Sequence, residues 1–104
     1  MLTAISVNHV LIRLTDERIG HIISNHPEVS SKITWIVETI GLPDLILEGN
    51  FSERIALKMY QKTPVSQSKY MAVVYKEEND HDGFVLTAYF CSSYNKRRKV
   101  LWKP

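Results

Sequence analysis

The sequence predicts a single α+β domain spanning residues 1–104, in which an N-terminal strand and two helices pack on an antiparallel sheet of about four strands. Two observations predict this fold. Apolar residues recur at helical spacing between residues 19 and 40, and they alternate with polar residues from residue 54 onward. Short turns join the strand-like segments, which favours antiparallel neighbours and places both helices on one face or end of the sheet.

Composition and charge are typical of a cytoplasmic domain. A chain of 104 residues with 44% hydrophobic residues is long enough to form one core. The single cysteine, Cys91, excludes an internal disulfide and suits a reducing compartment. We expect neither a signal peptide nor a membrane span, because no continuous apolar run is long enough. The net charge of +2 permits nucleic-acid binding without requiring it.

The first half of the chain contains the expected helices. A strand is predicted in residues 6–14, and Thr15 is a suitable N-cap for a helix that Pro27 ends. The apolar side of this helix carries Ile19, Ile22 and Ile23. Its polar side carries Arg18, His21 and Asn25. A second amphipathic helix is predicted over residues 29–40, with Gly41 as its stop signal.

The second half of the chain predicts the sheet, with strands in residues 54–62, 70–76 and 84–91 and a short edge strand in residues 100–102. In the first of these strands, one face is polar and carries Arg54, Lys58, Tyr60 and Lys62. In the third, strict alternation predicts one face of Phe84, Leu86, Ala88 and Phe90. The same alternation predicts an opposite face of Val85, Thr87, Tyr89 and Cys91.

Two histidines near the end of the first helix are the main candidates for chemistry. His21 and His26 are five residues apart, which turns them roughly 140° from each other on a helix and does not suit a zinc pair. We therefore expect no metal and no cofactor. Imidazole titrates near neutral pH and suits acid–base catalysis, and RNA cleavage by its own 2′-hydroxyl needs only a base, an acid and cations around the phosphate.

Other polar residues could complete such a site. Arg54 and Lys76 are candidates to stabilise a phosphate, and Thr87 and Tyr89 could orient the phosphate or stack on a base. Further contacts to RNA are expected from other basic and aromatic side chains of the helix, the strands and the basic run near the chain end, namely Arg18, Lys58, Tyr60, Lys96, Arg97 and Arg98.

Several short motifs occur in a characteristic order along the chain. They are Leu14-Thr15-Asp16-Glu17-Arg18, His21-Ile22, His26-Pro27-Glu28, Leu42-Pro43-Asp44, and the segments 70–76 and 84–89. In this order they resemble the small nuclease-like domains of the Barnase–EndoU–colicin–RelE group, and within it the branch found in phage and bacterial toxin proteins. The resemblance spans residues 10–102.

That resemblance implies a helical N-terminal part on a four-stranded antiparallel sheet and metal-independent cleavage of RNA. It also implies that His21 and His26 are the catalytic residues on the helix side, while Arg54, Lys76, Thr87 and Tyr89 come from strands. A toxin of this kind would be held in check by an antitoxin or immunity-type partner protein.

Two alternatives remain open. One is a non-catalytic domain of the same fold that binds RNA or a protein, which is favoured by Asn25 at a position where the group carries a basic residue. The other is a structural or assembly domain that forms a homodimer through an exposed sheet edge. The first would bind RNA without cutting it, and the second would show as a doubled mass in solution.

Overall fold

A seven-stranded mixed sheet forms the centre of the molecule in the computed structural model, which describes residues 1–104. The spatial order of the strands is β1-β2-β6-β5-β4-β3-β7. Their bounds are β1 Leu2–Ile5, β2 Leu11–Leu14, β3 Leu45–Glu48, β4 Arg54–Lys62, β5 Gln67–Glu77, β6 Asp82–Cys91 and β7 Val100–Trp102. The α+β class is confirmed.

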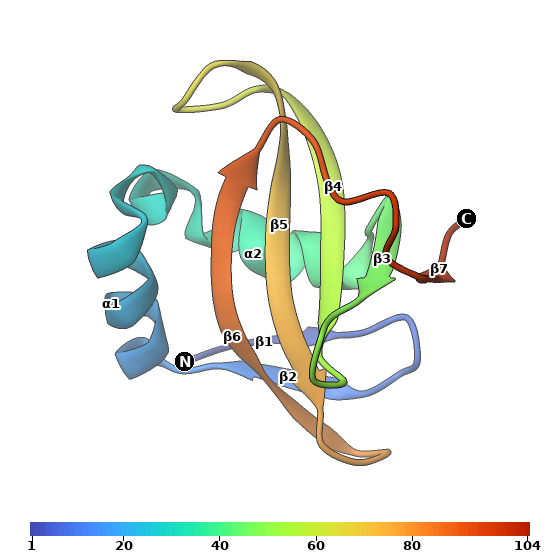
Figure 1. Cartoon of the computed structure of the whole chain (residues 1–104). Coiled ribbons are helices and arrows are strands. Elements are labelled where there is room, and N and C mark those ends of the chain that lie inside the picture. The colour runs from blue at the N-terminus through green and yellow to red at the C-terminus, as the bar shows by residue number, and fades with distance from the viewer.

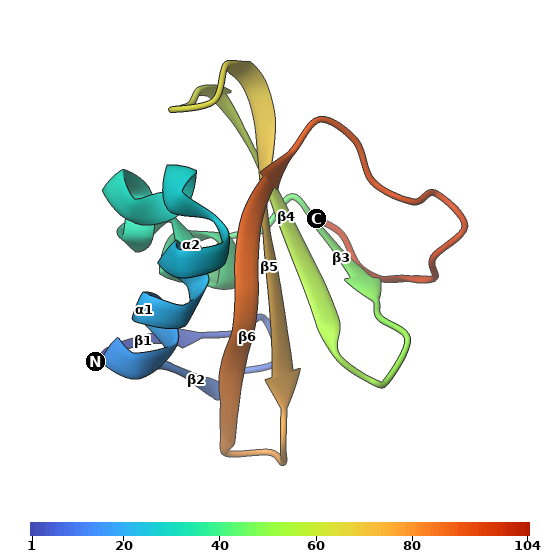
Figure 2. The same ribbon diagram turned by 60° about the vertical axis from the view of Figure 1, so that its left-hand side comes forward.

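All helices lie on one face of this sheet (Figures 1 and 2). They are α1 (Asp16–Asn25), the 3₁₀ helix η1 (Pro27–Lys32) and α2 (Ile33–Gly41). Helix α2 crosses behind β5 and β4 in Figure 1, whereas α1 lies beside β6. The chain after β6 crosses the opposite face of the sheet before it forms β7 (Figure 2). We call that opposite face the open face.

The sheet is larger than the sequence predicted. It has seven strands rather than about four, because residues 2–5 and 45–48 also pair into it. Only Leu11–Leu14 of the predicted first strand is extended, since the side chain of Ser6 accepts hydrogen bonds from Asn8 N and Val10 N and closes a turn there. His9 has a φ of 64° in this turn, which a straight strand does not allow.

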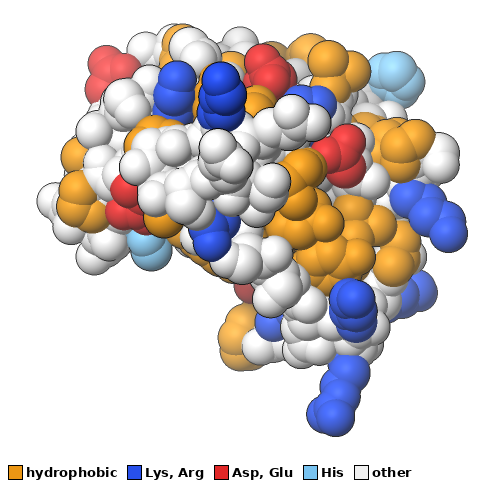
Figure 3. Space-filling model, turned by 90° about the horizontal axis from the view of Figure 1, so that it is seen from above, with side chains coloured by type: hydrophobic (Ala, Val, Ile, Leu, Met, Phe, Trp, Pro, Cys, Tyr) orange, Lys and Arg blue, Asp and Glu red, His pale blue; other side chains and the backbone are white.

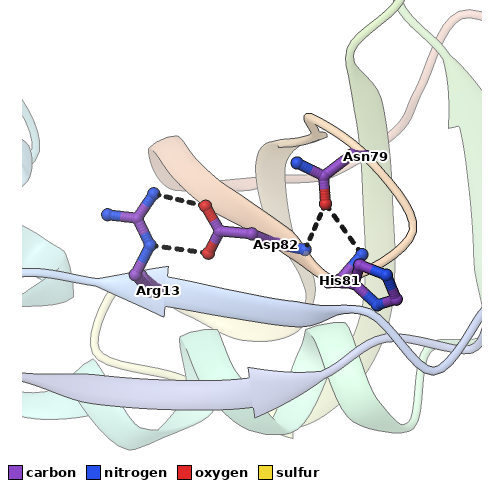
Figure 4. A network of polar contacts seen from close by, with 4 residues as sticks. All are labelled: Arg13, Asn79, His81 and Asp82. Atoms are coloured by element: carbon purple, nitrogen blue, oxygen red, sulfur yellow. Dashed lines mark hydrogen bonds and ion pairs between the residues drawn. The ribbon is translucent and has the colours of Figure 1, made fainter.

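The sheet is also mixed rather than purely antiparallel, because β2 runs parallel to β6. The Arg13 guanidinium on β2 donates two hydrogen bonds of 2.8 Å to the Asp82 carboxylate at the start of β6 (Figure 4). Asn79 Oδ1 accepts hydrogen bonds from the backbone N–H groups of His81 and Asp82 (Figure 4). These bonds stabilise the β5–β6 turn. The Arg13–Asp82 pair thus helps to fix where the N-terminal hairpin joins the sheet.

The main core lies between the helices and the sheet. The largest fully buried side chain is Tyr75 on β5, and the helices contribute Ile22, Ile36 and Ile40. A second, smaller cluster on the open face is built around Leu47, Leu57 and Ala72. The chain therefore buries apolar residues on both sides of its central strands, which explains why β5 is apolar over most of its length.

Two predicted elements differ in detail. The second helix begins as the 3₁₀ helix η1, because Pro27 stands at its first position and Lys32 takes a non-helical φ of −132° before α2. The strict alternation predicted for residues 84–91 is wrong at Leu86, where the register against β5 shifts by one residue. As a result, Val85 packs into the main core with Ala88 and Phe90.

None of the helices has the length and apolar character needed to cross a membrane.

Candidate functional site

The candidate site lies along the free edge of β6. Strand β2 pairs with β6 only from Asp82 to Phe84, so the rest of this edge has no neighbouring strand. Helix α1 and η1 pack there instead. Arg18 of α1 donates a hydrogen bond from Nη1 to the carbonyl oxygen of Leu86 at 3.3 Å. The unpaired edge therefore leaves the Leu86 carbonyl free to accept a hydrogen bond from Arg18 of α1.

His26 and Tyr89 form an aromatic contact between the end of α1 and β6. His26 is the C-cap of α1, where its backbone N–H donates to Ile22 O at 2.7 Å and its φ of −136° turns the chain out of the helix. The imidazole consequently lies beside the Tyr89 ring, with centroids 5.6 Å apart and an interplanar angle of 35°. The His26 Nδ1 atom also lies 3.7 Å from Glu28 Oε1.

His21 lies on the exposed surface of α1, more than one turn before His26. Asn25 Nδ2 donates to the His21 carbonyl at 3.2 Å and lies 3.3 Å from His21 Nε2. Together with Thr15, Glu17 and Arg18, His21 lines an entirely polar depression of about 370 Å³. The partner of His21 is thus within its own helix, whereas His26 contacts Tyr89 and lies near Glu28.

Three predicted strand residues share the open face next to this edge. Tyr89 pairs with Ala72 of the open-face cluster, and Thr87 pairs with Val74, two positions along β5. Lys76 follows on the same face of β5, because side chains alternate along a strand. Burial raises the pKa of the Tyr89 hydroxyl, with a smaller contribution from Cys91, and Arg98 lowers it. The hydroxyl is therefore protonated at neutral pH and can donate a hydrogen bond.

Three residues of β4 that the sequence suggested for RNA lie elsewhere, on the helix side. Arg54 Nε lies 3.5 Å from Glu77 Oε1 at the end of the sheet near the β1–β2 turn. Lys58 Nζ donates to the carbonyl of Leu42 at 2.8 Å. The Tyr60 hydroxyl donates to Glu38 at 2.6 Å, and its ring stacks on Trp35 with centroids 3.9 Å apart. These side chains fasten α2 and the β1–β2 turn, and none reaches the histidines.

The basic run lies in the segment that crosses the open face. Arg98 donates to the carbonyl of Glu48 and to Asn50 Oδ1, whereas Lys96 and Arg97 are exposed. No three His, Cys, Asp or Glu side chains lie close enough together to hold a metal ion.

Sequence reasoning missed two neighbours of the site. Glu28 could have been found from its position two residues after His26, which suggests a short-range ion pair. Tyr94 lies in an irregular segment and packs edge-on against Tyr70, with centroids 5.6 Å apart. No periodic signal marks Tyr94, since it belongs to neither a helix nor a strand.

Comparison with protein-family models, curated proteins and solved structures finds no match for this chain. The geometry of the site therefore carries the functional argument.

Proposed function

We propose that this chain is a small ribonuclease-type domain that cleaves RNA by general acid–base catalysis without a metal ion. The observation that carries the proposal is the contact between His26 and Tyr89, which joins the helix and the strand that the sequence singled out independently. The His26 imidazole, the Tyr89 phenol and the Arg18 guanidinium thus lie along the same edge of β6. Such a set matches what cleavage by the 2′-hydroxyl requires.

The reaction assigns each group a role. A histidine takes the proton of the 2′-hydroxyl, and the oxygen attacks the neighbouring phosphorus. The bond from phosphorus to the 5′-oxygen breaks, and the leaving oxygen receives a proton from a second acid. The products are a 2′,3′-cyclic phosphate and a free 5′-hydroxyl. His26 and His21 are the two acid–base groups, in either order.

The cations and hydroxyls around this edge act on the phosphate. Arg18 stabilises the negative charge that develops on the phosphorane oxygens. Lys76 pairs with Phe84, farther along β6 than Tyr89, and in this scheme it binds a neighbouring phosphate of the same RNA strand. Tyr89 donates a hydrogen bond from its protonated hydroxyl, and Thr87 orients the backbone of the RNA. Arg54 does not contact the phosphate in this scheme. Its ion pair with Glu77 instead stabilises that end of the sheet.

An unrestrained ribonuclease would be toxic to its own cell. We therefore infer a cytoplasmic toxin whose antitoxin or immunity-type partner covers the α1–β6 edge. The partner is expected to be acidic, because it would replace the RNA phosphates opposite Arg18 and Lys76.

The proposal is tested by induced expression in a bacterial host and by cleavage of total RNA in the presence of a chelator. His26→Ala and His21→Ala should each lower the cleavage rate about 10²–10⁴-fold, because each removes a positioned acid or base. Both variants should relieve the arrest of growth while the folded protein accumulates. His81→Ala is the matched control, since His81 is an exposed histidine in the β5–β6 turn and makes no contact with the site.

The non-catalytic alternative has one observation in its favour. Asn25 Nδ2 lies beside His21 Nε2, so one of the two histidines is engaged within its own helix. Under this alternative the protein binds RNA and leaves it intact. Cleavage that is equal in wild type, His26→Ala and His21→Ala would rule out the acid–base proposal.

A further inference from the structure

The open face of the sheet carries a pocket that the catalytic proposal does not use. The segment after β6 crosses this face without covering it completely, and it leaves a hollow of about 230 Å³. The apolar part of its lining consists of Leu47, Ile55, Leu57, Tyr89, Cys91 and Tyr94. Figure 3 shows apolar side chains gathered on one side of the molecule, with Lys and Arg side chains projecting around them.

Two tyrosine rings give this pocket an aromatic wall. Tyr94 packs edge-on against Tyr70, which holds the Tyr94 ring in place beside the strands. Tyr89 is half-buried on β6 and faces the same hollow. Flat aromatic surfaces in a half-open apolar hollow suit a flat ligand, and a nucleobase has a π-face of this kind whatever its sequence identity.

The charge around the pocket selects an anionic ligand. Residues 92–104 carry five lysines and arginines and no acidic residue. Arg98 lines the pocket itself, and its hydrogen bonds to Glu48 O and Asn50 Oδ1 hold the guanidinium in place. Its proximity also lowers the pKa of Tyr89, against the larger effect of burial. An apolar slot with a cationic rim fits a base attached to a phosphodiester backbone.

Tyr89 connects this pocket to the catalytic edge. Its ring contacts the His26 imidazole on one side, and the same side chain lines the pocket. A base seated in the pocket would therefore extend its sugar and phosphate toward β6, where His26 lies. Only the Tyr89 side chain lies between the pocket and His26.

We propose that this pocket, the Tyr89–Tyr94 pocket, binds one base of single-stranded RNA and so makes single-stranded RNA the substrate of the site. That the bound RNA is also a substrate rests on the ribonuclease function proposed above. Binding of the base itself rests only on the lining of the pocket. Base pairing in a duplex would keep the base in its helix and prevent its entry into the pocket. Double-stranded RNA is therefore expected to bind weakly and to resist cleavage.

Binding is measured by fluorescence anisotropy with a 2′-O-methylated single-stranded RNA of about ten nucleotides, a length within the range of known single-strand sites. This RNA has no attacking hydroxyl, so binding is separated from cleavage. Tyr94→Ala should raise the Kd about tenfold, because it removes one stacking surface. Tyr94→Phe should bind as wild type does. Phe51→Ala is the matched control, since Phe51 is an aromatic residue with 80% exposure outside the pocket.

The only cysteine supplies a second measurement on the unmodified chain, which stays informative if Tyr94→Ala does not fold. Cys91 lines the pocket and is partly accessible. Saturating amounts of the same RNA should slow the reaction of Cys91 with iodoacetamide severalfold. The methylated duplex, made from that strand and its complement, should not slow it.

The two proposals fail in different ways. An unchanged Kd for folded Tyr94→Ala, or an unchanged alkylation rate under saturating RNA, would overturn the pocket and leave cleavage by His26 standing. Wild-type protein that binds the methylated RNA, loses affinity on Tyr94→Ala and cuts no RNA would uphold the pocket and overturn the ribonuclease. Absence of any binding by wild type would also overturn the pocket.

Discussion

At the scale of single residues, environment decides what a side chain does. Glu77 is a carboxylate with only 13% of its side chain exposed, and three neighbouring side chains contact it. Ser6 Oγ donates to it at 2.7 Å, Asn8 Nδ2 at 3.1 Å, and Arg54 completes the set. A buried carboxylate that is satisfied in this way locks the β1–β2 turn onto β5, because breaking one of these contacts leaves charge without a partner.

The Arg13–Asp82 pair predicts a pH dependence of stability. Hydrogen bonding to Arg13 holds the pKa of Asp82 below its ordinary value of 3.8. A carboxyl whose folded pKa is lowered stabilises the protein above its unfolded pKa, and that contribution disappears as the pH falls through the folded pKa. Asp82→Asn should therefore lower Tm at pH 7, and the difference from wild type should vanish in the acid range below 3.8.

Thermal unfolding followed by circular dichroism between pH 2 and pH 7 checks this expectation. Asp80→Asn is the matched control, because Asp80 is exposed in the same turn and forms no ion pair. A gap between wild type and Asp82→Asn that persists at the acid end would contradict the assigned direction of the shift.

At the scale of elements, α1 is a short helix that packs beside the unpaired edge of β6 and carries the histidines of the candidate site. Its start is well capped, since Thr15 accepts a hydrogen bond from Arg18 N and Asp16 and Glu17 follow in the first turn. Its end is less well stabilised, because the last turn has no basic residue and His26 leaves the helical conformation. This turn at the C-terminal end is what directs the imidazole toward β6.

Gly20 in the middle of α1 is the weak point of this helix. A Cβ added there would meet nothing within 4 Å, and the position is exposed. Gly20→Ala should therefore raise the free energy of unfolding by about 0.5–1 kcal/mol, since alanine loses less backbone entropy in a helix. Urea denaturation measures this gain.

The same substitution separates stability from chemistry. Gly20 carries no functional group, so Gly20→Ala should cleave RNA as wild type does under the proposed mechanism. Ser24→Ala is a control on the same exposed side of the helix region, with an expected gain of a few tenths of a kcal/mol. A net loss of stability in Gly20→Ala would show that the helix packs there against something else.

At the scale of the whole molecule, the sheet connects the two ends of the chain and separates two environments. Its helix face buries the main core, and its open face carries the smaller cluster beneath the C-terminal segment. The only strand pairing between the N-terminal hairpin and the rest of the sheet is the short parallel contact between β2 and β6. The β1–β2 turn is also held to β5 by the hydrogen bonds of Ser6 and Asn8 to Glu77. The start of β6, where β2 and β5 both pack against it, is therefore important for the stability of the whole domain.

Gly83 at the start of β6 allows the backbone of β5 and the Ile12 side chain of β2 to approach closely. A Cβ at this position would collide with the carbonyl oxygen of Lys76 and lie 2.7 Å from Ile12 Cδ1. Gly83→Ala should lower the free energy of unfolding by about 1–3 kcal/mol, as overpacking of a close contact does. Differential scanning calorimetry measures the shift. An unchanged Tm would mean that β5 and the Ile12 side chain can move away from position 83 without cost. The Gly20→Ala variant provides the opposite sign for comparison.

Local patterns in the sequence were sufficient to predict the helices and the long strands, although not the short strands β1 and β3. The isoleucine stripe of residues 19–23 predicted α1, and the alternating residues of the long segments predicted β4, β5 and β6. The positions of Thr15 and Pro27 predicted where α1 begins and ends. These features depend on neighbours along the chain, so their physical causes are visible in the sequence.

The pairing of distant segments could not be read in the same way. The parallel contact of β2 with β6, the bulge at Leu86 and the inward direction of Lys58 and Tyr60 depend on which surfaces meet after folding. Periodicity shows that a strand has two faces, but it does not say which face α2 will cover. The sequence suggested the polar residues of β4 as a surface for RNA. In the structure, Lys58 and Tyr60 of this row instead contact α2 and the residue that follows it.

The same distinction applies to the candidate site: the sequence suggests its residues, and the fold decides which of them are neighbours. His21, His26, Thr87 and Tyr89 could be named from residue chemistry alone, because imidazoles, hydroxyls and phenols are recognisable wherever they occur. Only the folded chain decided that His26 meets Tyr89 and that Arg54 meets Glu77 instead. Side-chain chemistry is a property of each residue, whereas proximity is set by the burial of apolar surface over the whole sheet, and that is a property of the complete fold.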